Sequence, residues 1–521
     1  MWKTAKIFLI VIALAFIAGL TPTIINFLNE TVVYSVTKGL SLHPHFVAAM
    51  HVLWNTLKTY AWHITFIYAL IVAFIIFMEG QNPDRTILWM LVLVFLPVFG
   101  VIIYLVVGPD FENHKRRRQF QPLRLDRTPF SDDKRFMVGR MLHSLSGADL
   151  ALRNRVHVLV NGEETFAAIK EELKRAQKYI HLESFIINDD ELGREVRDIL
   201  VEAAKRGVKI RVLYDAIGSM SITSKYVKSL AKAGIKCFSF MPMAFPMFRR
   251  QMNFRNHRKI IVIDDRVAFT GGLNIGDEYL GKGHLGFWRD THVRLEGEAV
   301  SMLHKVFLDD WCDRTKEKPE SVCAEDGCAV KAGEYPEMPV VPMQIVSSGA
   351  NTPWHAISMG YFSLISRARE RLWITTPYLV PGPQLMTALR AAALSGVDVR
   401  IIIPSTKDHF VVFWGSRSNI EPLLRAGVRI FFYKKGFIHA KTMLADGEIC
   451  SVGSCNLDVR SLEINFETQL FIYDSLLSGV FAEQFEKDFA DCEEVSIEEW
   501  AQRPFRHKIL ESFGKLYSAQ I

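Results

Sequence analysis

The stretch FIHAKTMLADGEICSVGSCN, residues 437–456, decides how this chain is organised. His439 and Lys441 are two residues apart, so in a β-strand both side chains point to the same face. The residues around Asp446 predict a hairpin turn. A charged strand edge beside a glycine turn would explain the stretch as well, because a short motif on its own has little specificity.

An earlier stretch repeats the pattern. In NHRKIIVIDDRVAFTGGLN, residues 256–274, Asp264 follows Lys259 by five residues and Asn274 follows Asp264 by ten. His257 stands two residues before the lysine. The same spacings relate His439, Lys441, Asp446 and Asn456. A chance duplication of four residues at identical spacing is very improbable, so the stretch is one copy of an internal repeat.

The repeat extends beyond the two motifs. Residues 204–215 (AKRGVKIRVLYD) and 393–404 (ALSGVDVRIIIP) each pass from a helical pattern through a glycine into an apolar strand. Residues 175–186 and 367–379 are a second matching pair. Alternating helices and strands predict an α/β fold of two homologous halves, each a mixed, mostly parallel sheet flanked by helices.

Composition shifts divide the chain into six parts. We expect an N-terminal hydrophobic membrane segment at 1–30, a transmembrane helical hairpin at 59–110, the first half at 150–310, a polar linker at 311–340, the second half at 341–495 and a C-terminal tail at 496–521.

The N-terminal region predicts attachment to a membrane. Residues 61–78 and 87–107 are apolar, have aromatic residues near their ends and are about long enough to cross the hydrocarbon core. The basic cluster HKRRR, residues 114–118, follows the last apolar run and favours the cytoplasmic side for the rest of the chain. We therefore expect a multi-pass protein of the cell membrane.

The duplicated pattern HxKxxxxD, followed by GGLN or GSCN, resembles the phospholipase D superfamily. The hydrophobic N-terminus makes the chain resemble the bacterial cardiolipin synthases of that superfamily, as do residues 83–108 and 456–467. The resemblance implies that two phosphatidylglycerol molecules react to give cardiolipin and glycerol. A membrane-bound phospholipase D, which makes phosphatidic acid, would use the same motifs.

The motif residues suit phosphodiester chemistry. One histidine can attack phosphorus to form a phosphohistidine, and the other can act as acid and base on the two alcohols. Lys259 and Lys441 would bind the phosphate oxygens, and Asn274 and Asn456 would donate hydrogen bonds beside them. The site would form between the halves. The resemblance implies that His257 is the nucleophile and His439 the acid and base, although the residues alone equally allow the reverse.

Four carboxylates accompany the histidines. Asp264 and Asp446 belong to the motifs, but their odd spacing places them at the turn, so we expect them to support the hairpins. Asp290 and Glu467 follow their motifs by 33 and 28 residues. The resemblance implies that each orients the histidine of the opposite half, Glu467 with His257 and Asp290 with His439; ordinary surface acids are the alternative.

The sequence also bears on metals, other cofactors and partners. Seven cysteines do not form a disulfide framework, and Cys323 and Cys328 lack a second pair at zinc spacing, so we expect neither a metal nor another cofactor. A net charge of +6 would permit a nuclease, yet the basic residues cluster near the membrane segments and we expect no nucleic acid. The expected partners are phosphatidylglycerol, cardiolipin and the bilayer, which residues 237–254 would enter as a lip beside the site.

Overall fold

The computed structural model describes residues 136–240, 254–328, 335, 337–349, 352 and 354–517, with scattered positions between 67 and 100. The chain forms two compact units, Met1–Asp110 with Ala244–Met252, and Phe111–Met243 with Asn253–Ile521. Apart from those scattered positions, the expected membrane segments lie outside the described residues, as does most of the expected lip. Among the described residues, no helix combines the length and the apolar character needed to cross a bilayer.

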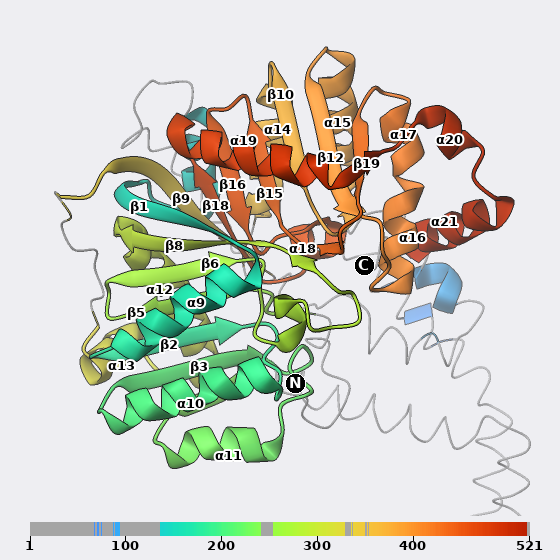
Figure 1. Ribbon diagram of the computed structural model, residues 1–521. Coiled ribbons are helices and arrows are strands. Elements are labelled where there is room, and N and C mark those ends of the chain that lie inside the picture. The colour runs from blue at the N-terminus through green and yellow to red at the C-terminus, as the bar shows by residue number, and fades with distance from the viewer. Residues whose placement is uncertain are drawn as a thin grey trace, which may run out of the picture. The chain divides into compact units, whose positions relative to one another are not determined.

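One continuous sheet runs through both halves of the second unit (Figure 1). Within the described residues it has fifteen strands in the order β19-β13-β12-β10-β15-β16-β18-β9-β1-β8-β6-β5-β2-β3-β4. The first half contributes β1 (Ala151–Val160), β2 (Tyr179–Ser184), β3 (Lys209–Asp215), β4 (Lys236–Phe240), β5 (Ile260–Ile263), β6 (Val267–Gly271) and β8 (Thr291–Gly297). The second half contributes β9 (Val340–Ser348), β10 (Arg371–Thr375), β12 (Asp398–Pro404), β13 (Arg429–Tyr433), β15 (Thr442–Ala445), β16 (Ile449–Gly453), β18 (Glu467–Ile472) and β19 (Cys492–Glu494).

The two halves have the same strand order when each is followed outward from the centre. β1 and β9 pair antiparallel and join the halves, and β1-β8-β6-β5-β2-β3-β4 corresponds to β9-β18-β16-β15-β10-β12-β13. The two-part α/β architecture expected from the repeat is therefore confirmed.

The repeated helix–glycine–strand pattern has a conformational cause. Helix α10 (Glu191–Lys205) leads to Gly207 at φ 93°, and helix α15 (Pro383–Leu394) leads to Gly396 at φ 91°. Only glycine adopts this conformation without a steric penalty, so the helix ends there and the chain turns into β3 or β12.

The sheet is mixed, but less parallel than we expected. Parallel pairing is confined to β2-β3-β4 and β10-β12-β13, and the strands between those groups pair antiparallel. The reason is that each motif forms a hairpin, β5–β6 or β15–β16, whose strands must run in opposite directions.

Helices cover both faces of the sheet, as the alternation of β5 shows. Ile261 and Ile263 pack in the cluster that contains residues of α9 (Asn161–Arg175) and α10, whereas Ile260 and Val262 pack with residues of α12 (Glu298–Thr315). The α12 cluster also includes second-half residues such as Leu470, so the halves share one core. The remaining helices are α8 (Met137–Ser146), α11 (Ser224–Lys232), the 3₁₀ helix η4 (Asp277–Leu280), α13 (Pro319–Asp326), α14 (Ala356–Arg367), α16 (Phe410–Ser418), α17 (Ile420–Leu424), α18 (Val459–Glu463), α19 (Ser475–Ala490), α20 (Ile497–Ala501) and α21 (Phe505–Tyr517).

Candidate active site

Short strands cross between the halves beside each motif histidine. β7 (Trp288–Arg289) of the first half pairs in parallel with β14 (Phe437–Ile438) of the second, and Asn256 forms the equivalent bridge to Phe466. The His257 amide N–H donates to the Phe466 carbonyl at 2.9 Å, and the His439 amide N–H donates to the Arg289 carbonyl at 2.7 Å. Each histidine is thus held by backbone from the opposite half.

The residue that follows each crossing strand is the carboxylate. Glu467 Oε2 lies 3.0 Å from His257 Nδ1, and Asp290 Oδ2 lies 2.8 Å from His439 Nδ1. Both carboxylates are fully buried. Because an ionised carboxylate can only accept, Nδ1 of each imidazole carries the proton and Nε2 keeps its lone pair. This is the crossed pairing that the resemblance implied, and surface acids are excluded.

Both motif lysines are buried beside the histidines. Lys259 Nζ donates to the His257 carbonyl at 2.7 Å, and Lys441 Nζ donates to the His439 carbonyl at 2.6 Å. Lys441 Nζ also lies 2.9 Å from each ring nitrogen of His439. Burial lowers the pKa of Lys259 to about 7 and that of Lys441 to about 8. An anion between them would restore both charges.

The charges of the four motif residues act on one another. Burial lowers the pKa of His257, and the charges of Lys259 and Lys441 add to the effect against the opposing influence of Glu467. Burial and then Lys441 lower the pKa of His439 to about 3. Since each lysine also affects the histidine of the other half, the two motifs face one site.

The two asparagines are not equivalent. Asn274 Nδ2 donates to the Tyr279 hydroxyl at 2.9 Å, and its Oδ1 accepts from the Ile186 N–H at 3.2 Å. Its side-chain oxygen and one of its two amide hydrogens are therefore engaged within the protein. The expected donation to a phosphate stays a prediction that rests on the second amide hydrogen. Asn456 Oδ1 is buried without a hydrogen-bond partner among the described residues, whereas the Asn456 side chain makes a hydrogen bond to the Asp458 carboxylate.

The motif aspartates stand at the hairpin turns. Asp264, at φ 56°, accepts from the N–H groups of Lys178 at 2.8 Å and Tyr179 at 2.9 Å. Asp446, at φ 53°, likewise accepts from Glu370 N–H at 2.8 Å. Each carboxylate ties its hairpin to the start of the neighbouring strand, which supports a structural role.

Sequence reasoning missed two buried arginines that support the site. Arg258 pairs with Asp310 of α12, and Arg289 pairs with Asp488 of α19 at 2.7 Å and 2.8 Å. The available signal was position, because Arg258 directly follows His257 and Arg289 directly precedes Asp290. Each ion pair fixes a crossing strand to a helix of the core.

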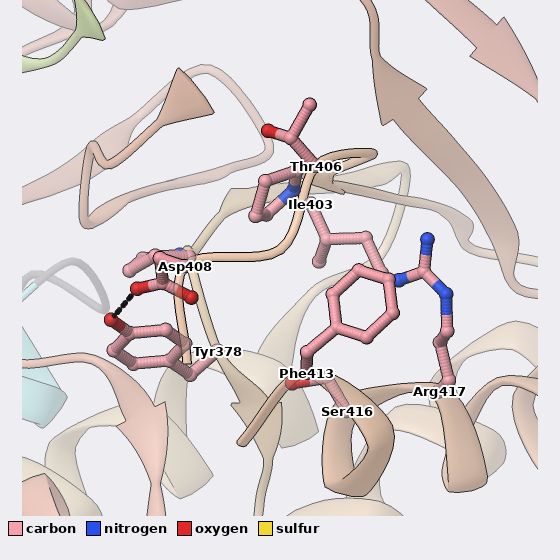
Figure 2. A pocket seen from close by; sticks show the side chains of 9 residues that line it. Tyr378, Ile403, Thr406, Asp408, Phe413, Ser416 and Arg417 are labelled. Atoms are coloured by element: carbon pink, nitrogen blue, oxygen red, sulfur yellow. Dashed lines mark hydrogen bonds between the residues drawn. The ribbon is translucent and has the colours of Figure 1, made fainter. Parts of the chain in front are cut away.

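A pocket lies in the second half of the chain (Figure 2). It is lined by Pro377, Tyr378, Ile403, Pro404, Thr406, Asp408, Phe413, Ser416 and Arg417. The Tyr378 hydroxyl donates to Asp408, and the Arg417 guanidinium lies 3.6 Å from the centre of the Phe413 ring. β11 (Leu379–Val380) pairs with β17 (Leu457–Asp458), which places Tyr378 opposite Asn456. The pocket therefore lies beside the strand that follows Asn456.

Two family models match the sequence. One, described as cardiolipin synthase, PLD-like domain, matches residues 169–311 and 361–491. The other, described as phospholipase D-nuclease N-terminal, matches residues 65–109. The first model thus covers both motif-bearing halves, and the second covers the expected transmembrane hairpin.

Curated relatives are similar over most of the chain. Cardiolipin synthase 2 of Bacillus anthracis is 39% identical over 86% of this chain and 89% of its own. The major cardiolipin synthase of Bacillus subtilis (strain 168) is 37% identical over 86% and 96%. Among solved structures, the phosphatidylserine synthase of Haemophilus influenzae Rd KW20 has a TM-score of 0.58 at 18% identity, covering 74% of this chain and all of that one, which shows a common fold.

Proposed function

Because the chain belongs to the family of phospholipase D-like cardiolipin synthases, we propose that it transfers a phosphatidyl group between two phosphatidylglycerol molecules, giving cardiolipin and glycerol. The crossed pairs His257–Glu467 and His439–Asp290 carry the proposal. They bring two imidazoles with matching tautomers and two buried lysines into one site, as a two-step substitution at phosphorus requires.

In the first step, His257 Nε2 attacks the phosphorus of one phosphatidylglycerol. A P–N bond forms, the bond from phosphorus to the glycerol oxygen breaks, and His439 supplies the proton that the glycerol takes away. His439 must first be protonated. The anionic phosphodiester provides the means, because negative charge beside the imidazole raises the pKa that burial and Lys441 depress.

In the second step, a hydroxyl of another phosphatidylglycerol gives its proton to His439 and attacks phosphorus. The P–N bond breaks and His257 is restored. Lys259 and Lys441 neutralise the non-bridging oxygens as charge develops. Glu467 and Asp290 stabilise the positive charge of their histidines and hold the tautomers.

We also place the enzyme at the cell membrane, with its catalytic unit on the cytoplasmic side. The match of residues 65–109 to the N-terminal family model supports the membrane location, and the basic residues 114–118 support the side. A cysteine introduced at an exposed catalytic-unit position, such as Leu476→Cys, should react with an impermeant thiol reagent in inverted vesicles and not in intact cells. Labelling in intact cells would show that the catalytic unit lies on the outer side of the membrane.

The decisive experiment supplies vesicles of phosphatidylglycerol to the purified full-length enzyme and measures every product. Equal amounts of cardiolipin and glycerol, lost in His257→Ala and in His439→Ala, are expected. Phosphatidic acid in place of cardiolipin would make water the acceptor and the enzyme a phospholipase D. Cardiolipin formed at the wild-type rate by both variants would overturn the mechanism.

A further inference from the structure

A second cluster of reactive side chains lies far from the crossed histidines. His304 on α12, Cys323 on α13 and Cys328 just after it bring one nitrogen and two sulfur atoms within 4.8 Å of one another. His304 and Cys323 are buried, and Cys328 is half-buried. The neighbouring Asp265 stands at the β5–β6 turn, at the opposite end of β5 from Lys259, so the cluster is separate from the active site.

The chain folds locally so that the two cysteines converge. Helix α13 ends at Gly327, whose φ of 74° lies in the left-handed region. The N–H groups of Gly327 and Cys328 both donate to the Cys323 carbonyl, at 2.8 Å and 3.2 Å. This turn carries Cys328 back beside Cys323 despite a separation of five residues. A chelating pair of thiols is the result.

A chain of hydrogen bonds fixes the protons on the histidine. His181 Nε2 lies 2.9 Å from Asp326 Oδ2, and His181 Nδ1 lies 2.9 Å from His304 Nε2. The carboxylate accepts, so His181 Nε2 carries hydrogen and its Nδ1 must accept from His304 Nε2–H. The lone pair of His304 is therefore on Nδ1.

That lone pair faces negative charge. His304 Nδ1 lies 3.7 Å from Asp265 Oδ1, which also accepts from the Tyr179 hydroxyl at 2.7 Å. The histidine and the two thiols thus form one cluster, with the Asp265 carboxylate beside the histidine. Metal-binding histidines typically donate their other ring N–H to a hydrogen-bonded partner, as His304 does through His181 to Asp326.

We propose that His304, Cys323 and Cys328 bind a zinc ion, beside which the Asp265 carboxylate stands. Two thiolates and an imidazole favour zinc over magnesium or calcium, which prefer oxygen. Tetrahedral Zn–S and Zn–N bonds of about 2.3 Å and 2.0–2.1 Å need only a small closure of the cluster. The sequence analysis missed the site because its third ligand, His304, lies nineteen residues before Cys323 in the previous helix.

The ion would have a structural role. α13 belongs to the segment between the halves and is already tied to β3 by Asp326, which pairs with Arg211. Zinc would connect α12 to α13 beside the β5–β6 turn. It would thereby fix the path from the first half to β9 and the start of the second, whatever reaction the active site performs.

The test measures metal in the full-length enzyme, purified in detergent without chelator or polyhistidine tag. We expect about one zinc per chain, lost in Cys323→Ser and Cys328→Ser and retained in the matched control Cys492→Ser, whose half-buried thiol lies in the second half. If a variant fails to fold, wild-type protein refilled with Co²⁺ should show thiolate-to-metal charge-transfer absorption. Chelator should lower its unfolding temperature, and zinc should restore it.

Three outcomes would overturn the proposal. They are wild-type protein that takes up no zinc or cobalt, zinc that remains in both cysteine variants, and a disulfide between the two cysteines. The disulfide would appear as two fewer titratable thiols than the seven of the sequence in denatured, unreduced protein.

Discussion

In the first half the Phe185 ring stands against His257, with ring centroids 5.0 Å apart, and the Lys259 ammonium lies 5.5 Å from the same ring. In the second half Pro377 occupies the equivalent position, and the pocket of Figure 2 opens beside it. His439 instead contacts Trp288, an aromatic residue of the opposite half. Two motifs with the same spacing therefore present different surfaces to a substrate.

A second difference lies behind the carboxylates. Ser454 Oγ donates to Glu467 Oε2 at 2.5 Å, whereas the corresponding Gly272 leaves room for Asp290, because a Cβ there would lie 2.0 Å from Asp290 Oδ1. The longer glutamate is held by a hydroxyl, and the shorter aspartate is held by close packing and the Thr291 N–H at 2.8 Å. The two motifs therefore share their geometry but hold their carboxylates by different contacts.

The largest effect should come from removing one histidine at a time. With ³²P-labelled phosphatidylglycerol, His439→Ala should form labelled protein slowly and turn it over very slowly, because its nucleophile remains. His257→Ala should acquire no label. Both should lose at least about 10²–10⁴-fold in kcat. Label that appears on His257→Ala and not on His439→Ala would show that His439 is the nucleophile and His257 the acid and base.

Substitution of the two carboxylates that contact the histidines should have the next largest effect on kcat. Glu467→Gln and Asp290→Asn keep the size of each side chain but remove the charge that fixes the histidine tautomer, so kcat should fall by roughly 10²–10⁴-fold. Glu467→Gln should slow formation of labelled enzyme. Circular dichroism would check that both variants fold, and activity within about twofold of wild type in either one would contradict a role in orientation.

Substitutions of the residues that hold the two carboxylates should lower kcat by different amounts in the two halves. Gly272→Ala should displace Asp290 and lower kcat by about 100-fold, whereas Ser454→Ala removes one hydrogen bond worth about 1–3 kcal/mol and should cost about tenfold. Gly479→Ala is the control, since nothing lies within 4 Å of the added Cβ. Equal losses in the two variants would show that the halves tolerate change alike.

The pH dependence should report the two lysines. With the pKa of Lys259 at about 7 and that of Lys441 at about 8, the unliganded site loses positive charge as pH rises through that range. kcat/KM should therefore fall above pH 7, by up to about tenfold per unit, while kcat changes less because bound phosphate raises both pKa values. Initial rates at constant ionic strength test this, and a flat kcat/KM from pH 7 to 9 would refute it.

The smallest effect should come from the pocket. Tyr378→Phe removes the hydroxyl that donates to Asp408, so KM for phosphatidylglycerol should rise about 3–10-fold with little change in kcat, if the pocket receives a glycerol headgroup. Ile186→Val, at the equivalent position of the first half, should leave KM unchanged. An unchanged KM in both variants would show that the pocket does not bind the substrate.

Much of the site could be predicted from the sequence, because the repeat gives each motif residue a counterpart at identical spacing. His257 and Lys259, like His439 and Lys441, share a strand face through local geometry alone. The turn position of Asp264 and Asp446 followed from the same period of two residues. The two-part α/β fold followed from the repeated helix–glycine–strand units, since glycine is needed where the helix ends.

Other features required the folded chain. The balance of antiparallel pairing, the contact of Asn274 with Ile186 and the meeting of His304 with Cys323 all join segments with no common spacing in the sequence. The pairing of Glu467 with His257 spans 210 residues and was suggested by family resemblance, not by any local pattern. The sequence by itself determined the chemical groups and the duplication, because these are local. Only the tertiary structure decided which groups meet, because the pairing of β1 with β9 and the crossing strands bring residues of the two halves together.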